Sequence, residues 1–219
     1  MIRICPSILN ANFDDLPGEI EKVASTADLI HLDVMDNVFV PNSTFSPERT
    51  REIIDFSTLP IDVHLMVAEV DEKVSQYSSK NAVSMTVHFE ACQDPLQTLK
   101  NIRSLGKRAG LAIKPDTPIE VVEELLPAID MIVVMTVEPG FGGQSFMASM
   151  MPKVEKARRY LEQRKLNDVW LQIDGGISLS TIETARRAGA DTFVAGSAVY
   201  KSENPASMVE QLRMLANNC

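Results

Sequence analysis

Short runs of apolar residues alternate along the whole chain with longer segments of helical periodicity. Eight runs are rich in apolar and β-branched side chains, and most lack regular polar alternation, as expected for parallel strands that are buried on both faces. We predict strands at Arg3–Leu9, Leu29–Met35, Pro60–Met66, Ser84–His88, Ala109–Ile113, Met131–Thr136, Trp170–Asp174 and Thr192–Ala195.

The segments between these runs repeat their apolar residues at a spacing close to that of an α-helix. We predict helices at Leu16–Ala24, Pro47–Phe56, Val70–Ser78, Pro95–Leu105, Ile119–Leu126, Ser149–Leu161, Leu179–Ala188 and Pro205–Ala216. Thr117-Pro118 and Asn204-Pro205 are typical of helix starts, and Gly106 and Gly189 are placed where helices end.

Eight strand–helix units in 219 residues predict a (β/α)₈ TIM barrel, an α/β fold. No linker or change of composition divides the chain, so we expect one domain over residues 1–219. A doubly wound open sheet is the alternative fold. It usually carries a glycine fingerprint after its first strand, where this chain has Ser7-Ile8-Leu9-Asn10.

Composition narrows the classes of partner. The net charge is −9, from 21 basic and 30 acidic residues, and no basic stripe is present, so nucleic acid is not an expected partner. No apolar run approaches the roughly 18–20 residues of a membrane span. The first residues lack the regions of a signal peptide, and Cys5, Cys92 and Cys219 form no Cys-x-x-Cys motif. We therefore expect a cytoplasmic protein with reduced thiols and no membrane association.

Polar residues interrupt the apolar strands at the ends where a barrel places its chemistry. His31, Asp33, His64 and Asp174 supply nitrogen and oxygen donors that suit one divalent cation, Zn²⁺, Fe²⁺, Mn²⁺ or Co²⁺. A lone buried histidine would more often be a structural residue. Two of the three histidines of the chain lie at such strand ends, which favours ligands, whereas we expect a supporting or structural role for His88.

Asp33 and Asp174 come from strands on different sides of the predicted barrel. Two carboxylates across a pocket suit a reaction that needs a base and an acid on opposite faces of one carbon. A shared cation would offset the repulsion between them. Met35, Met66 and Met135 also end strands and, if they are more than core residues, line the pocket and exclude water.

Glycine-rich loops follow the sixth, seventh and eighth strands. They have neither Walker nor dinucleotide-binding spacing, but glycines allow backbone N–H groups to approach an anion, and barrels often bind phosphate at these positions. Together they predict a phosphate site formed by Gly140, Phe141, Gly142, Gly143, Gly175, Gly176, Gly196 and Ser197.

Five ordered motifs, which span almost the whole chain, together resemble the ribulose-phosphate 3-epimerase family. The motifs are Ser7-Ile8-Leu9, His31-x-Asp33-Val34-Met35-Asp36-x-x-Phe39-Val40-Pro41-Asn42, Asp62-x-His64-Leu65-Met66, Val137-x-Pro139-Gly140-Phe141-Gly142-Gly143-Gln144 and Asp174-Gly175-Gly176. The family consists of TIM barrels that interconvert D-ribulose 5-phosphate and D-xylulose 5-phosphate in the pentose phosphate pathway.

The resemblance implies roles for individual residues. It implies that His31, Asp33, His64 and Asp174 bind one divalent metal ion, and that Asp33 and Asp174 transfer protons at C3 through a metal-stabilised cis-enediolate. It also implies that Ser7 and His64 contact the substrate, whose phosphate lies on the glycine-rich loops. Two positions depart from the family pattern: Asn37 replaces a usual glycine, and Lys114 replaces a frequent asparagine. Asparagine tolerates a left-handed backbone, so the turn at Asn37 can be retained.

Three other functions compete with this hypothesis. A 3-epimerase acting on a hexulose 6-phosphate, such as D-allulose 6-phosphate, would use the same chemistry, and a non-catalytic barrel could bind a sugar phosphate without turning it over. A phosphate-binding barrel decarboxylase would carry Asp-x-Lys-x-x-Asp, which Asp33-Val34-Met35-Asp36 does not match. For a barrel of this kind we expect a homo-oligomer with a small-molecule sugar phosphate as its ligand.

Overall fold

The eight predicted strands form one parallel sheet in the computed structural model, which describes residues 1–219. The strands are β1 Arg3–Pro6, β2 Ile30–Met35, β3 Ile61–Met66, β4 Ala82–His88, β5 Arg108–Ile113, β6 Met131–Met135, β7 Trp170–Asp174 and β8 Thr192–Ala195. Neighbours pair in the order β1-β8-β7-β6-β5-β4-β3-β2, and an isolated bridge between Ser7 and His31 brings β1 against β2. The predicted TIM barrel is therefore confirmed.

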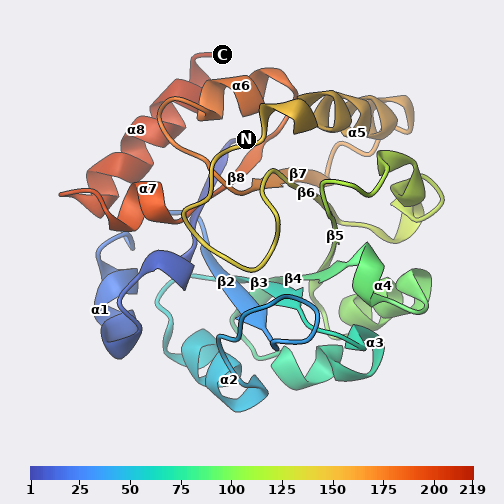
Figure 1. Cartoon of the computed structure of the whole chain (residues 1–219), viewed down its shortest axis with the longest axis horizontal. Coiled ribbons are helices and arrows are strands. Elements are labelled where there is room, and N and C mark those ends of the chain that lie inside the picture. The colour runs from blue at the N-terminus through green and yellow to red at the C-terminus, as the bar shows by residue number, and fades with distance from the viewer.

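Helices surround the strands in a ring (Figure 1). They are α1 Leu16–Glu21, α2 Pro47–Phe56, α3 Val70–Lys73, α4 Pro95–Ser104, α5 Met151–Gln163, α6 Ile182–Arg187, α7 Ser197–Tyr200 and α8 Pro205–Asn217. The loop that follows β6 crosses the central opening in the view of Figure 1. None of the helices combines the length and the apolar composition that a membrane span requires.

Two predicted elements differ from the structure. The first strand ends at Pro6, because the Ser7 hydroxyl accepts a hydrogen bond from the N–H of Leu9 and starts a 3₁₀ turn over Ile8–Asn10. The helix predicted at Ile119–Leu126 is replaced by 3₁₀ turns at Ile119–Val122 and Leu126–Ala128. Pro127 cannot donate the backbone hydrogen bond that would continue a helix there.

The other helix boundary signals act as predicted. The Asn204 side chain accepts a hydrogen bond of 3.0 Å from the N–H of Ser207 at the start of α8. Gly106 follows α4 with φ +73°, and Gly189 follows α6 with φ +108°. Both glycines adopt a backbone conformation that other residues rarely take, so they end their helices at low cost.

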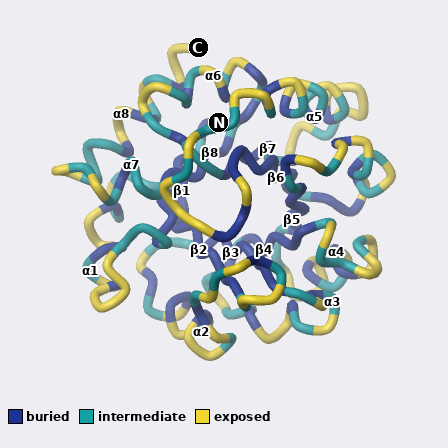
Figure 2. Tube along the Cα trace, in the orientation of Figure 1, coloured by how far each residue is buried: buried dark blue, intermediate teal, exposed yellow.

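The two faces of the sheet bury different kinds of side chain. Outward-facing residues such as Val63, Leu65 and Ile132 belong to the main hydrophobic core between strands and helices. The buried strands lie at the centre and exposed segments lie around them (Figure 2). Inside the barrel, by contrast, buried polar side chains from β2, β3, β4 and β7 replace part of the apolar filling, and these are His31, Asp33, Asp62, His64, Ser84, Thr86, His88, Gln172 and Asp174. A polar interior of this kind needs a chemical explanation, because buried polar groups are costly unless they are paired.

Candidate active site

The register between β2 and β3 brings four polar side chains together. His31 lies opposite Asp62, and Asp33 lies opposite His64. All four are buried in the barrel interior. Because side chains two residues apart on a strand point to the same face, both strands direct this set inward. Asp174, at the end of β7, joins them from another part of the barrel.

His31, Asp33, His64 and Asp174 offer donor atoms that all lie within 4.8 Å of one another, and we call these residues the ligand cluster. His64 Nδ1 lies 3.3 Å from Asp33 Oδ1 and 3.2 Å from Asp174 Oδ2. His31 Nε2 lies 3.3 Å from His64 Nδ1, 3.3 Å from Asp33 Oδ1 and 3.7 Å from Asp174 Oδ2. Ligand bonds of about 2.0–2.2 Å in a tetrahedron place donors roughly 3.4 Å apart. The donor set and its spacing therefore fit one divalent cation.

The charges of the cluster act on one another strongly. Burial opposes a proton on His31, but the charge of Asp33 and hydrogen bonds from the carboxylates raise its pKa well above the usual value. Burial also opposes the charged form of His64, and hydrogen bonds to Asp174 and Asp33 raise its pKa. Although burial disfavours the ionised forms of Asp33 and Asp174, His31 is the main cause that holds both of their pKa values below the usual range. The carboxylates thus create a negative potential at the ring nitrogens, and a divalent cation is attracted by the same potential.

A buried carboxylate that the sequence reading did not single out orients His31. Asp62 Oδ2 lies 2.8 Å from His31 Nδ1 and accepts from Gln172 Nε2 at 2.8 Å, while Ser84 Oγ donates to Asp62 Oδ1 at 2.6 Å. Burial alone would raise the pKa of Asp62, but the hydrogen bond to His31 and these donors lower it. An ionised Asp62 keeps the Nδ1 proton of His31 in place, so that Nε2 faces the cluster.

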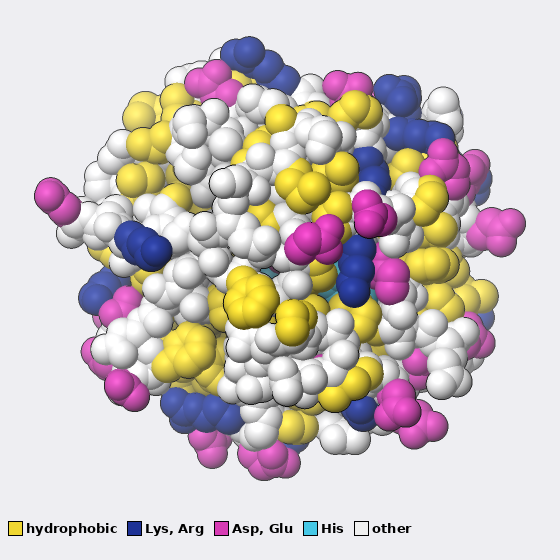
Figure 3. Space-filling model, viewed as in Figure 1, with side chains coloured by type: hydrophobic (Ala, Val, Ile, Leu, Met, Phe, Trp, Pro, Cys, Tyr) yellow, Lys and Arg dark blue, Asp and Glu magenta, His cyan; other side chains and the backbone are white.

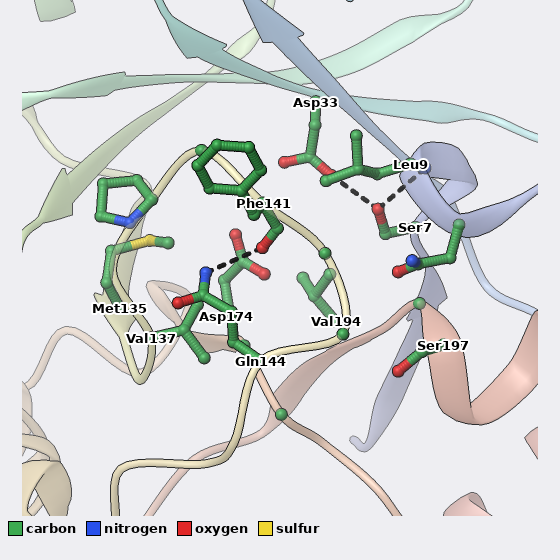
Figure 4. Close-up of a pocket in the computed structure, with 18 of the residues that line it drawn as sticks. Ser7, Leu9, Asp33, Met135, Val137, Phe141, Gln144, Asp174, Val194 and Ser197 are labelled. Carbon is green, nitrogen blue, oxygen red and sulfur yellow. Dashed lines mark hydrogen bonds between the residues drawn. The ribbon is translucent and has the colours of Figure 1, made fainter. Parts of the chain in front are cut away.

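The two aspartates of the cluster have different surroundings. Asp33 Oδ2 accepts a hydrogen bond of 2.6 Å from the Ser7 hydroxyl, whereas Asp174 has no comparable side-chain donor on its second oxygen. Figure 4 shows both carboxylates directed into one pocket, with Ser7 beside Asp33. Ser7 therefore holds Asp33 in one orientation.

The pocket above the cluster is lined by all but His64 of the residues predicted to contact substrate, together with Met35, Met66 and Met135. The three methionines are at most 3% exposed and form an apolar wall beside the carboxylates. The histidines are almost completely hidden in the space-filling view, where Lys and Arg are scattered over the visible face (Figure 3). No Lys or Arg lines the pocket.

Backbone amides take the place of basic side chains at one end of the pocket. We use the term glycine loops for residues 140–143, residues 175 and 176, and Gly196 with Ser197. The N–H groups of Gly142, Gly143, Gly176 and Ile177 line the pocket and have no hydrogen-bond acceptor within the chain. Free amides of this kind can bind an anion without a positive side chain.

Close packing around Gly175 and Gly176 explains why glycine is needed there. Gly175 has φ +119°, and an added Cβ would lie 2.4 Å from Cγ2 of Val137. Gly176 has φ +68°, and its Cβ would lie 2.6 Å from the backbone nitrogen of Phe146. Asn10, which the sequence reading did not assign to the site, packs against Gly142 and Gly196 and thereby joins two of the glycine loops.

The structure gathers the predicted residues at one end of the barrel, which is the C-terminal end of the strands. His88, for which a supporting role was expected, lies 3.0 Å from His64 through its Nε2. Asn37 adopts φ +58°, as expected for a replacement of glycine at this turn, and its N–H donates to the carbonyl of Asn42 at 2.7 Å. Phe141 is 54% exposed, so its ring lies at the rim rather than inside the pocket.

A barrel with buried histidines and aspartates at the strand ends, beside unpaired loop amides, defines a class: TIM-barrel enzymes with a candidate metal centre and an anion pocket. The model of the ribulose-phosphate 3 epimerase family matches residues 3–200. The chain belongs to this family, and the prediction that it is an isomerase of this kind is confirmed.

Curated relatives match over almost the full chain. The ribulose-phosphate 3-epimerase of Bacillus subtilis strain 168 is 38% identical over 97% of this chain and 99% of its own length. The enzyme of the same name from Mycobacterium leprae is 42% identical, over 97% and 94%.

Among solved structures, KGPDC from Streptococcus mutans in complex with a sugar phosphate has a TM-score of 0.75 at 15% identity and covers 100% of this chain and 99% of its own. N-(5'-phosphoribosyl)anthranilate isomerase from Pyrococcus furiosus has a TM-score of 0.65 at 17% identity, with 100% coverage of both chains. At these identities the two structures support the barrel fold alone.

Proposed function

We propose that the enzyme interconverts D-ribulose 5-phosphate and D-xylulose 5-phosphate by proton transfer at C3, with Asp33 and Asp174 as the acid/base pair. One observation carries this proposal: carboxylates from β2 and β7 face one pocket whose far end presents only amide donors. The names of the relatives and the sugar phosphate bound to a structural neighbour agree with it.

Inversion at C3 requires two groups, because a single base would return the proton to the face it left. The C3 proton is acidic, since C3 neighbours the C2 ketone, and one aspartate removes it while the other delivers a proton to the opposite face. The aspartates exchange roles in the reverse reaction. Ser7 keeps the Asp33 carboxylate oriented by its hydrogen bond of 2.6 Å. Met35, Met66 and Met135 exclude water from the reacting carbon.

The ligand cluster would hold one divalent cation, Zn²⁺, Fe²⁺, Mn²⁺ or Co²⁺, through His31, Asp33, His64 and Asp174. When bound, this ion supplies positive charge that stabilises negative charge on the substrate oxygens. The phosphate lies on the glycine loops, where unpaired N–H groups compensate for the absence of Lys and Arg.

The test is to replace each aspartate separately by asparagine. Asp33→Asn and Asp174→Asn should each reduce kcat by about 10²–10⁴-fold, the usual contribution of a positioned acid or base. Incorporation of deuterium at C3 from D₂O, followed by NMR, measures the proton transfer directly. Asp116→Asn is the control, because Asp116 is exposed on a loop at the same end of the barrel and should retain wild-type exchange.

Wild-type turnover in either cluster variant would show that the acid/base assignment is wrong. Wild-type protein that binds D-ribulose 5-phosphate without exchanging its C3 proton would instead be a sugar-phosphate-binding barrel. Faster exchange with D-allulose 6-phosphate would identify a hexulose phosphate as the preferred substrate.

A further inference from the structure

A series of hydrogen bonds leads from the ligand cluster to the edge of the barrel through His88, at the end of β4. His64 directs Nδ1 toward the cluster, and its Nε2 lies 3.0 Å from Nε2 of His88. The ring centroids are 5.0 Å apart and the planes differ by 21°, so the rings meet nitrogen to nitrogen. His88 Nδ1 lies 3.3 Å from Oε2 of Glu90.

Metal ligation would fix the positions of the protons in this series. A ring nitrogen that binds a cation uses its lone pair, so His64 bound through Nδ1 carries its proton on Nε2. That N–H donates to Nε2 of His88, which therefore has no proton. Neutral His88 then carries its proton on Nδ1 and needs an acceptor there. The ionised Glu90 carboxylate is such an acceptor.

Glu90 is held between two elements of the barrel. Its Oε1 accepts from the backbone N–H of Lys114 at 2.8 Å and from the Thr117 hydroxyl, both in the loop after β5. Lys153 fixes this loop by donating to the carbonyls of Lys114, Pro115 and Thr117 at 3.1, 2.7 and 2.7 Å. The Glu90 side chain is 21% exposed, so it joins the buried histidines to the rim of the barrel.

We propose that Glu90 is a positioning residue for the metal centre: acting through His88, it fixes the tautomer and orientation of His64 so that Nδ1 is presented to the cation. This inference rests on the metal site of the proposed function. His31 shows the same design with one link fewer, because Asp62 contacts its Nδ1 directly at 2.8 Å. Both ligand histidines are thus backed by a carboxylate, as is common for metal-binding histidines.

The test compares Glu90→Gln with Thr117→Val. Glutamine retains the size of Glu90 but has one amide group, which cannot accept from both His88 and the loop. Its amide would therefore compete with the His88 proton, and we expect Co²⁺ to bind about 10–100-fold more weakly. Thr117→Val removes a hydrogen bond to the same carboxylate and leaves the Glu90–His88 contact unchanged. Its Co²⁺ affinity should stay within about threefold of wild type.

Co²⁺ affinity is measured by competition with a chelator, and the visible absorption of bound Co²⁺ reports the geometry of the site. Nitrogen-15 NMR of the Zn²⁺-loaded protein identifies the tautomers, and His88 should carry its proton on Nδ1. A double-mutant cycle provides the decisive comparison. His88→Phe should also weaken Co²⁺ binding, and Glu90→Gln should add less than about twofold in that background, because Glu90 acts through His88.

The two hypotheses fail in different ways. If wild-type protein binds Co²⁺ tightly and Glu90→Gln binds it equally well, the role of Glu90 is refuted and the proposed function remains. Equal effects of Glu90→Gln and Thr117→Val, or additive effects with His88→Phe, would likewise overturn the inference. If wild-type protein binds neither Co²⁺ nor Zn²⁺, the metal part of the proposed function fails, and the inference fails with it.

Discussion

The ligand cluster and the glycine loops lie at the same end of the barrel, but they are built in opposite ways. The cluster consists of four buried side chains whose donors are fixed by strand register and by partners such as Asp62. The glycine loops bind through backbone N–H groups and depend on the absence of side chains at Gly175 and Gly176. A substitution in the cluster therefore acts by removing atoms, and one in the loops acts by adding them.

Removal of the metal should have the largest effect and should act on the cluster alone. Chelation should abolish C3 exchange, and adding back a divalent cation should restore it. A ligand at about 100 times its Kd adds roughly 2.7 kcal/mol of stability, which corresponds to about 5–10 °C in the Tm of a chain of this size. Differential scanning calorimetry with and without chelator measures this shift.

His64→Ala provides the control, because loss of a ligand should remove the effect of the added cation on Tm. Inorganic phosphate should still raise the Tm of the chelated protein if the glycine loops are independent of the cluster. Unchanged exchange and Tm after chelation would contradict the metal site.

An intermediate effect is expected when a methyl group is added to a glycine loop. Gly176→Ala would place Cβ 2.6 Å from the Phe146 nitrogen, whereas Gly106→Ala meets no atom within 4 Å. Their φ values, +68° and +73°, are nearly equal, so both pay the same left-handed strain of about 1–2 kcal/mol. Only Gly176→Ala should displace a phosphate-binding amide and raise KM, by about tenfold or 1.4 kcal/mol.

Steady-state kinetics and urea unfolding of the two variants separate strain from loss of the anion site. Gly106→Ala should be destabilised with an unchanged KM. Equal KM values in the two variants would mean that the loop after β7 does not hold the phosphate.

The same contrast explains what the sequence could and could not predict. His31 and Asp174 were predicted because charged or polar residues are unusual in apolar strands, and eight strands with intervening helices predicted the barrel. The ends of elements were less accurate where local side-chain bonds or a proline decide them, as at Ser7 and Pro127. Sequence patterns contain little information about such local competition.

Partnerships across strands were the main omission. Asp62 is paired with His31 by the register of β2 with β3, and Glu90 reaches the cluster only through His88. Asn10 contacts Gly142 and Gly196, which are more than 130 residues away along the chain. Each of these contacts depends on three-dimensional placement, so spacing along the sequence could not identify it.

Asn37 allows the smallest and sharpest test of the comparison, because it has a left-handed backbone in the loop that follows the cluster strand β2. It is exposed at φ +58°, so Asn37→Gly should change the free energy of unfolding by less than about 1 kcal/mol. Asn37→Val should cost about 1–2 kcal/mol. Neither variant should change kcat or Co²⁺ affinity, since side chains anchored on β2 and β3 determine the cluster geometry. A tenfold change in either quantity would show that the cluster depends on loop backbone, as the phosphate site does.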